Sequence, residues 1–249
     1  MLPSMAQPIP VPKGGKVFVL TGAGISAESG IKTFRDADGL WESHRFEDVA
    51  SPEGWRADPA LVWRFYSERR AQAKAVRPNA AHVALAELET HLRDDLFLCT
   101  QNVDALHEAA GAKRVVHMHG QLAMSRCEDP ACATKPFADE GLYRTLAEIP
   151  RCQCGAMIRP HIVWFGEEPF ELHTIKRRAQ ECDLFVTIGS SGVVYPAAGL
   201  VREIRYRQSM GERVRSIYVG LERPDNAAEF DDVRLGKAGE ILPSLFDLR

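Results

Sequence analysis

Short apolar runs alternate with amphipathic helical patterns along most of this chain, and this alternation limits its fold more than any other feature. Such apolar runs predict buried strands, and the longer periodic patterns between them predict helices. We expect strands at Lys16–Leu20, Leu96–Cys99, Val115–Met118, Leu184–Ile188 and Ser216–Val219, and helices at Ala80–Leu92, Phe170–Glu181 and Pro196–Arg207. Strands that alternate with helices form mostly parallel sheets. The sequence therefore predicts an α/β fold: a Rossmann-like parallel sheet with helices on both faces.

Two segments interrupt this alternation. In Asp58–Val76, Asp58 supplies a helix N-cap and Pro59 suits the first helical position, so a helix is expected. Gln121–Ile158 is irregular and contains four of the six cysteines. We predict a flexible leader at 1–15, a Rossmann-like domain made of 16–43, 78–120 and 159–249, and a smaller domain made of 44–77 and 121–158.

Composition and charge exclude several classes of protein. With 45% hydrophobic and 26% charged residues among 249, the chain has enough apolar side chains for a sizeable core. The formal net charge of −3 gives no global reason to bind nucleic acid, and no stretch approaches the ~18 apolar residues of a membrane span. The segment before Gly15 lacks the apolar block of a signal peptide. We expect a cytoplasmic monomer that binds neither membranes nor specific nucleic acids.

The first expected strand runs directly into a glycine-rich turn, Gly22-Ala23-Gly24-Ile25-Ser26-Ala27. The turn matches the G-x-G-x-x-A pattern, in which glycines let the backbone approach a pyrophosphate. A tight strand-to-helix turn without a ligand would show the same pattern. The continuation, Ser29–Asp36, stays polar where a simple dinucleotide-binding unit would already run a long helix. We interpret it as a loop able to close over a bound cofactor.

Polar side chains follow two further strands, at the sheet edge where ligands bind in open α/β folds. Gln101, Asn102 and Asp104 follow one strand, and they could fix a polar ligand or cap the next helix. His117 and His119 end the next strand, and a histidine with an ordinary pKa of ~6.5 can accept a proton near neutral pH. Because alternate strand residues share a face, the local pattern does not choose between the two histidines.

Four cysteines form two close pairs, Cys127-x4-Cys132 and Cys152-x-Cys154, with 19 residues between the pairs. Two close pairs held apart by a loop suit tetrahedral coordination of one Zn²⁺ by thiolates. Four thiolates leave no coordination position open, so such a zinc would stabilise the smaller domain and take no part in catalysis. We therefore predict a small zinc-binding domain.

The helix expected at Asp58–Val76 carries an arginine in its apolar face. A 100° step per residue groups Arg69 with Val62, Phe65, Tyr66, Ala73 and Val76. A guanidinium among apolar neighbours needs an anionic partner or must extend to solvent, and Tyr66 offers a hydroxyl beside it. Arg69 is therefore either a structural partner of a nearby carboxylate or a receptor for an anionic ligand group.

Taken together, the residues resemble the sirtuins, the NAD-dependent protein lysine deacylases, from about Val17 to Leu248. The matching segments, in order, are Gly22-Ala23-Gly24-Ile25-Ser26, Gly30-Ile31, Phe34-Arg35, Thr100-Gln101-Asn102-Val103-Asp104, His119-Gly120, the four cysteines and Arg159–Glu167. Within the family the chain is similar to the branch that removes acidic acyl groups, because Tyr66-x-x-Arg69 matches its acyl-recognition pair. Val163–Glu167 and Val193–Pro196 also fit that branch. A succinyl or malonyl carboxylate would then be the anionic partner of Arg69.

The resemblance implies a role for each matching residue. His119 would be the general base, Asn102 would also be catalytic, and His117 would be structural. The acylated peptide would be bound by Tyr66, Arg69, Val163, Phe165, Gly166, Glu167 and Val193. NAD would be bound by Gly22, Ala23, Gly24, Ser26, Phe34, Arg35, Trp41, Gln101, Asn102, Val103, Asp104, Gly189, Ser190, Ser191, Gly220, Leu221, Glu222 and Ala238. Zinc would be bound by Cys127, Cys132, Cys152 and Cys154.

In the family's reaction the acyl oxygen displaces nicotinamide from the ribose of NAD, and the histidine activates a ribose hydroxyl that collects the acyl group. The resemblance implies NAD-dependent removal of succinyl, malonyl or acetyl groups from protein lysines, giving nicotinamide and O-acyl-ADP-ribose. The chain departs from the family pattern at Ser190, which replaces a threonine. It also departs at Gly220, where an asparagine side chain often meets the adenine-side ribose.

Two functions of other classes stay open. An ordinary Rossmann oxidoreductase would explain the glycine turn and His119, but it leaves the cysteines, Gln101–Asp104 and Trp164–Glu167 without roles. A non-catalytic zinc-bearing module could instead hold a peptide along Val163–Glu167 by β-augmentation. Release of free nicotinamide distinguishes deacylation from both.

Overall fold

The computed structural model describes residues 7–11, 14–31 and 44–247, together with the backbone of 40–41. Six parallel strands form the main sheet in the order β12-β11-β10-β2-β5-β6. Their bounds are β12 (Asp232–Leu235), β11 (Arg215–Gly220), β10 (Leu184–Ile188), β2 (Val17–Thr21), β5 (Leu96–Thr100) and β6 (Val115–His117). The strand that leads into Gly22 is therefore central, between β10 and β5.

Nine α-helices lie in the described residues. They are α1 (Gly24–Ala27), α2 (Phe46–Val49), α3 (Pro52–Ala57), α4 (Pro59–Ala73), α5 (Ala80–Leu92), α6 (Leu106–Ala109), α7 (Leu172–Glu181), α8 (Leu200–Ser209) and α9 (Ala238–Ile241). Short 3-10 turns are η1 (Arg93–Asp95), η2 (Leu146–Glu148), η3 (Ala197–Gly199), η4 (Ala227–Glu229) and η5 (Leu242–Ser244). None of these helices is both long and apolar enough to cross a membrane.

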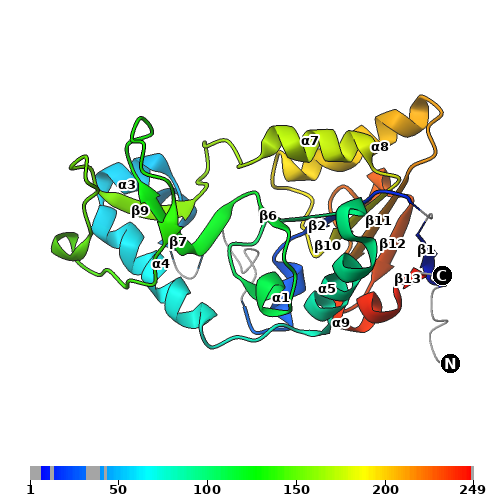
Figure 1. The fold of residues 1–249 in the computed structure, drawn as a ribbon, viewed down its shortest axis with the longest axis horizontal. Coiled ribbons are helices and arrows are strands. Elements are labelled where there is room, and N and C mark those ends of the chain that lie inside the picture. The colour runs from blue at the N-terminus through cyan, green and yellow to red at the C-terminus, as the bar shows by residue number, and fades with distance from the viewer. Residues whose placement is uncertain (1–6, 12–13, 32–39, 42–43, 248–249) are drawn as a thin grey trace.

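Alternate side chains of β2 pack into two different cores, one on each face of the main sheet. Val17 and Val19 pack in one core with α5 and α9, and Phe18 and Leu20 pack in the other with α7 and α8. Figure 1 shows these two layers of helices, with α7 and α8 on one side of the strands and α5 and α9 on the other. The predicted α/β fold is confirmed.

A second, antiparallel sheet has the order β8-β7-β9, with bounds β8 (Phe137–Ala138), β7 (Gly120–Cys127) and β9 (Ile158–Ile162). Its apolar side chains share a third core with α3 and α4, which includes Trp55, Val62, Trp63 and Tyr66. In Figure 1 this group lies at the end of the molecule away from α9. Segments more than 40 residues apart in sequence, such as α4 and β7, thus pack as one unit.

The small sheet corrects two expectations. Gln121–Ile158 is not irregular throughout, because eight residues from Gly120 to Cys127 form β7. The large domain was also expected to resume at residue 159, but β9 continues to Ile162 and pairs with β7. Residues up to Ile162 therefore belong with the small sheet.

Other differences lie at the ends of elements and of the chain. The pattern at Pro196–Arg207 is divided between η3 and α8, and the strand β12 was not expected. Part of the expected leader is ordered, because β1 (Ile9–Pro10) pairs in parallel with β13 (Phe246–Asp247) and Ile9 is buried. A hydrophobic side chain at Ile9 thus fixes a segment whose composition alone indicated a loose tail. The remaining pair of strands is β3 (Leu40–Trp41) with β4 (His44–Arg45).

Candidate active site

The glycine-rich turn after β2 packs backbone to backbone against the loop after β10. A Cβ atom on Gly22 would lie 2.8 Å from the Cα of Ser190, and one on Gly24 would lie 2.7 Å from the Cα of Gly189. The N–H of Gly24 donates to the carbonyl of Gly189 at 2.8 Å. Both glycines are therefore required for this close approach, which holds Ser190 beside the turn.

Asn102 and Asp104 tie the loop after β5 to the same turn. Asn102 Nδ2 donates to the carbonyl of Gly22 at 3.2 Å and to Ser26 Oγ at 3.1 Å. Ser26 Oγ donates to Asp104 Oδ2 at 3.1 Å, and Asp104 Oδ1 accepts the N–H of Leu106 at 3.1 Å. Asp104 therefore contacts both the turn and the first residue of α6, whereas the side chain of Asn102 bonds to the turn and not to α6. Burial raises the pKa of Asp104, partly offset by the hydrogen bonds from Leu106 and Ser26.

Gln101 joins the loop after β5 to β2 and to the loop after β10. Its Nε2 donates to Ser190 Oγ at 3.0 Å, and its N–H donates to the carbonyl of Thr21 at 2.9 Å. The serine that replaces the family's threonine thus still offers its hydroxyl to the amide of Gln101. The residues after β2, β5 and β10 consequently meet at one carboxyl edge of the sheet, as the sequence predicts.

The two histidines after β6 differ in their hydrogen bonds. Nδ1 of His119 lies 3.0 Å from the carbonyl of Gln101, and its Nε2 bonds to none of the described residues. Nδ1 of His117 lies 3.2 Å from the carbonyl of Asn102, and its Nε2 lies 2.6 Å from Glu108 Oε1. A carbonyl only accepts hydrogen bonds, so Nδ1 of His119 carries the proton and Nε2 holds a lone pair. Burial lowers the pKa of His119, partly offset by the bond to Gln101.

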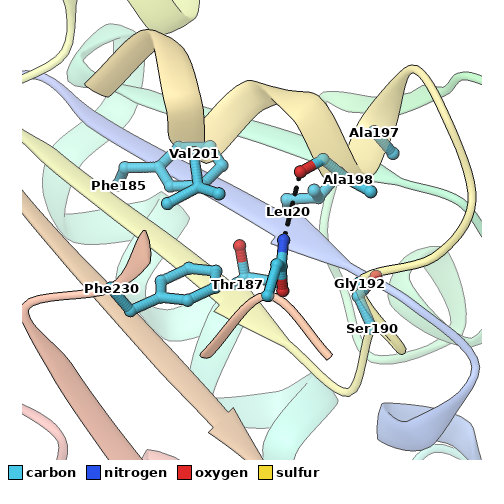
Figure 2. Close-up of a pocket in the computed structure, with 10 residues that line it drawn as sticks. Leu20, Phe185, Thr187, Ser190, Gly192, Ala197, Ala198, Val201 and Phe230 are labelled. Atoms are coloured by element: carbon cyan, nitrogen blue, oxygen red, sulfur yellow. Dashed lines mark hydrogen bonds between the residues drawn. The ribbon is translucent and has the colours of Figure 1, made fainter. Parts of the chain in front are cut away.

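A small void lies under the loop after β10, on the side of the sheet covered by α8 (Figure 2). Its volume of about 10 Å³ has room for one water molecule. Asn226 Nδ2 donates across it to the carbonyl of Ala198 at 3.1 Å, the bond drawn dashed in Figure 2. The void is too small for any part of a dinucleotide. The void is therefore a packing gap beneath the loop that contains Ser190 and Gly192.

Several expected NAD contacts are not brought together with these residues. Phe34 and Arg35 lie outside the described residues, and only the backbone of Trp41 is described. The side chain of Ala238 is buried in the core with α5, so it does not belong to the polar edge. A Cβ on Gly220 would lie 2.4 Å from Tyr218 Oη, which occupies the space of a side chain at this position. The remaining expected contacts, Ala23, Val103, Ser191, Leu221 and Glu222, lie in the loops that follow β2, β5, β10 and β11.

Helix α4 buries both Tyr66 and Arg69. Asp58 caps it by accepting the N–H of Leu61 at 2.8 Å, with Pro59 at the first turn as expected. Arg69 is 8% exposed, and its Cζ lies 4.4 Å from the centroid of the Phe65 ring. The buried face with its embedded arginine is thus confirmed for Val62, Phe65, Tyr66 and Arg69, but the helix ends at Ala73, so Val76 lies beyond it.

A second buried arginine on α4 was not expected from the sequence. Arg70 is 4% exposed and donates to the carbonyls of Leu122 and Gly141, each at 2.7 Å, and to Ser125 Oγ at 2.9 Å. Its charge is balanced by Asp139 at 3.2 Å. Arg70 therefore joins α4 to the small sheet. Its acceptors lie more than 50 residues along the chain, so no local pattern indicates them.

The segment Val163–Glu167 lies directly beside His119. The N–H of Val163 donates to the carbonyl of His119 at 2.9 Å, and Phe165 is 42% exposed. Glu167 faces Arg159, which donates to its two carboxylate oxygens at 2.7 and 3.0 Å. Although burial acts to raise it, Arg159 holds the pKa of Glu167 below its usual value. The carboxylate of Glu167 is thus occupied by an ion pair with Arg159. Phe165 is the side chain of this segment that is exposed and that a peptide can contact.

The four cysteines converge as predicted. Their Sγ atoms all lie within 4.8 Å of one another, with Cys127 to Cys154 at 3.5 Å and Cys132 to Cys152 at 3.6 Å. Tetrahedral zinc with bonds of about 2.3 Å needs sulfur atoms about 3.8 Å apart. The four side chains fit one zinc ion, and all four coordination positions would be filled by sulfur.

Comparison with known proteins agrees with this geometry. The Sir2 family matches residues 22–196. A curated relative from Pasteurella multocida (strain Pm70), named NAD-dependent protein deacylase, is 48% identical over 92% of this chain and 95% of its own. A solved Sir2 homologue–NAD complex is 38% identical, with a TM-score of 0.80 over 93% of this chain and 88% of that one. A structure titled Sir2 bound to acetylated peptide is 29% identical, with a TM-score of 0.74 over 91% and 90%. By sequence and by fold, this chain belongs to the Sir2 family, the sirtuins.

Proposed function

We propose that this protein is an NAD-dependent protein lysine deacylase that transfers the acyl group to ADP-ribose and releases nicotinamide. One observation carries the proposal: the glycine turn, Gln101, Asn102 and Ser190 are hydrogen-bonded together at one sheet edge, with His119 bonded to Gln101. The curated relatives carry the name NAD-dependent protein deacylase, and one neighbour binds NAD. A series of acyl-lysine peptides incubated with NAD and followed by mass tests it directly. Nicotinamide and O-acyl-ADP-ribose are the expected products.

The residues at this edge suit NAD. Gly22, Ala23 and Gly24 would line its phosphates, and Gln101, Asn102 and Asp104 would bound its ribose and nicotinamide. NAD supplies a ribose carbon from which nicotinamide can be displaced by the acyl oxygen. Asn102 is held from two sides, by Gly22 and Ser26, so its remaining polar atoms are fixed in direction.

His119 is proposed as the general base. Its Nδ1–H donates to Gln101, which fixes the neutral tautomer with the lone pair on Nε2. Burial keeps its pKa below the ordinary value, so the imidazole is neutral at pH 7 and ready to take a proton from a ribose hydroxyl. His117 has both ring nitrogens engaged, which suits a structural role.

The pH dependence of the reaction follows from the pKa of His119. Because its pKa is lowered, the neutral base persists below the ordinary value of ~6.5 and is lost only as the pH falls through the lowered pKa. We expect kcat/KM to be nearly flat from about pH 8 to 7 and to fall to half of its plateau only below the ordinary value of ~6.5. A kcat/KM profile with saturating NAD checks this. An acid limb centred well above pH 7 would contradict the assignment.

The acyl preference is proposed to be for succinyl and malonyl groups, recognised by Tyr66 and Arg69. The two side chains lie one turn apart on α4, both buried, in the core that also holds Trp164. In such surroundings charge-assisted hydrogen bonds from a guanidinium to a carboxylate are about twice as strong as neutral ones. Arg70 joins α4 to the small sheet, and the carboxylate that lies 4.0 Å from the guanidinium of Arg69 is that of its exposed neighbour Glu68.

Arg69→Met tests the acyl preference. Loss of one side of a buried charge pair costs about 2–5 kcal/mol, so we expect kcat/KM for a succinyl-lysine peptide to fall at least about tenfold. Turnover of the acetyl-lysine form of the same peptide should stay constant or rise, because a buried charge is removed. Arg64→Met, at an exposed arginine of the same helix, is the matched control and should change neither. Equal losses on both substrates would mean that Arg69 is structural.

A further inference from the structure

Trp164 lies between the segment beside His119 and the acyl-recognition pair. The backbone on each side of it is fixed: Val163 N–H donates to His119 at 2.9 Å, and Phe165 N–H donates to the carbonyl of Ala50 at 3.0 Å. The side chain of Trp164 is 2% exposed, whereas that of Phe165 is 42% exposed. The indole therefore points into the core beneath the surface on which a peptide would lie.

The indole of Trp164 is hydrogen-bonded to the hydroxyl of Tyr66. Trp164 Nε1 donates to Tyr66 Oη at 3.1 Å, and Tyr66 is completely buried. An indole N–H can only donate, so the direction of this hydrogen bond is fixed and the tyrosine oxygen is the acceptor. The Tyr66 proton must therefore point away from Trp164, as a donor. A carboxylate, which only accepts, is the chemical group that such a hydroxyl suits.

Arg159 and Glu167 hold the indole in place. The Cζ of Arg159 lies 3.3 Å from the centroid of the Trp164 ring. Glu167 accepts two hydrogen bonds from Arg159 and a third, at 2.8 Å, from the backbone N–H of Trp164. The guanidinium over the ring and the carboxylate on the backbone thus restrain the same residue from two directions.

We propose that Trp164 is a positioning residue for acyl choice: its indole N–H orients the Tyr66 hydroxyl as a donor to an acidic acyl group, and the Arg159–Glu167 pair fixes the indole. This inference rests on the proposed acidic-acyl preference. It places part of the specificity in the segment that holds the peptide, rather than on α4 alone.

Trp164→Phe removes the N–H donor and keeps an aromatic ring. We expect kcat/KM for a succinyl-lysine peptide to fall about three- to tenfold, the size of one hydrogen bond, mainly through KM. The acetyl-lysine form should change less than about twofold. In a Tyr66→Phe background the same substitution should no longer alter the succinyl-to-acetyl ratio, because the hydroxyl on which it acts is absent. Thermal melts confirm that each variant is folded.

Trp63→Phe is the matched control. Trp63 is equally buried in this core, but its indole N–H donates to the carbonyl of Ile158 at 2.9 Å, not to Tyr66. It should affect both peptides equally. If Trp164→Phe proves unfolded, Arg159→Lys keeps the charge beside Glu167 without the planar group over the ring, and it should lower the succinyl-to-acetyl ratio in the same direction.

The outcomes separate the two proposals. An unchanged succinyl-to-acetyl ratio in folded Trp164→Phe, or an unchanged ratio in Arg159→Lys, overturns the positioning role while a wild-type preference for succinyl-lysine would stand. A wild-type enzyme without that preference instead overturns the proposed acyl specificity itself. A selective loss that disappears in the Tyr66→Phe background supports the inference.

Discussion

His119→Ala is expected to lower kcat/KM for deacylation by about 10²–10⁴-fold, the usual contribution of a positioned base, while the protein stays folded. The side chain lies at the sheet edge and makes one hydrogen bond to a backbone carbonyl, so its removal leaves all three hydrophobic cores intact. Steady-state kinetics on a succinyl-lysine peptide, with a thermal melt of the same preparation, measure both effects.

His117→Ala is the matched control for this substitution. His117 lies two residues away, but its two ring nitrogens face the carbonyl of Asn102 and the carboxylate of Glu108. We expect a smaller loss of activity than in His119→Ala, together with some loss of stability. A larger kinetic loss in His117→Ala would transfer the role of base to that residue.

Removal of the zinc ligand Cys152 is expected to have the largest effect on stability. Structural zinc contributes about 10–16 kcal/mol in small zinc domains. Here Cys127 and Cys152 belong to the core that holds α4 and β7, and Cys132 packs against it. We expect about one zinc per chain in the purified wild type and none in Cys152→Ser, with a strongly lowered melting temperature. Elemental analysis and thermal melts measure these quantities, and a strong chelator should reproduce the change.

Cys182→Ala controls for loss of a buried thiol. Cys182 is also buried, but it lies beside α7, and its thiol donates to the carbonyl of Ala179. This variant should keep its zinc and lose much less stability. Folded, active wild-type protein without zinc would refute the prediction.

The amino-acid sequence by itself determined the secondary structure that carries the site. Apolar runs and glycine turns are local signals, so β2, β5 and β10 could be predicted within one or two residues. Their parallel direction followed from the helices between them, but their order in the sheet did not. The arginine in the apolar face of α4 was equally visible, because helical periodicity acts over a few residues. Four cysteines in two close pairs needed only their chemistry to indicate zinc.

The tertiary structure decided the contacts on which chemistry depends. The strand pattern placed His117 and His119 on one face without choosing between them. Their partners in the folded chain differ, since Glu108 engages the second ring nitrogen of His117 and the ring of His119 bonds only to Gln101 among the described residues. The hydrogen bond from Trp164 to Tyr66 joins residues 98 positions apart, and that from Asn102 to Gly22 joins residues 80 apart. Such pairs form only when sheets and helices pack, because propensity and periodicity act over about two helical turns and carry no information on which distant side chains will meet.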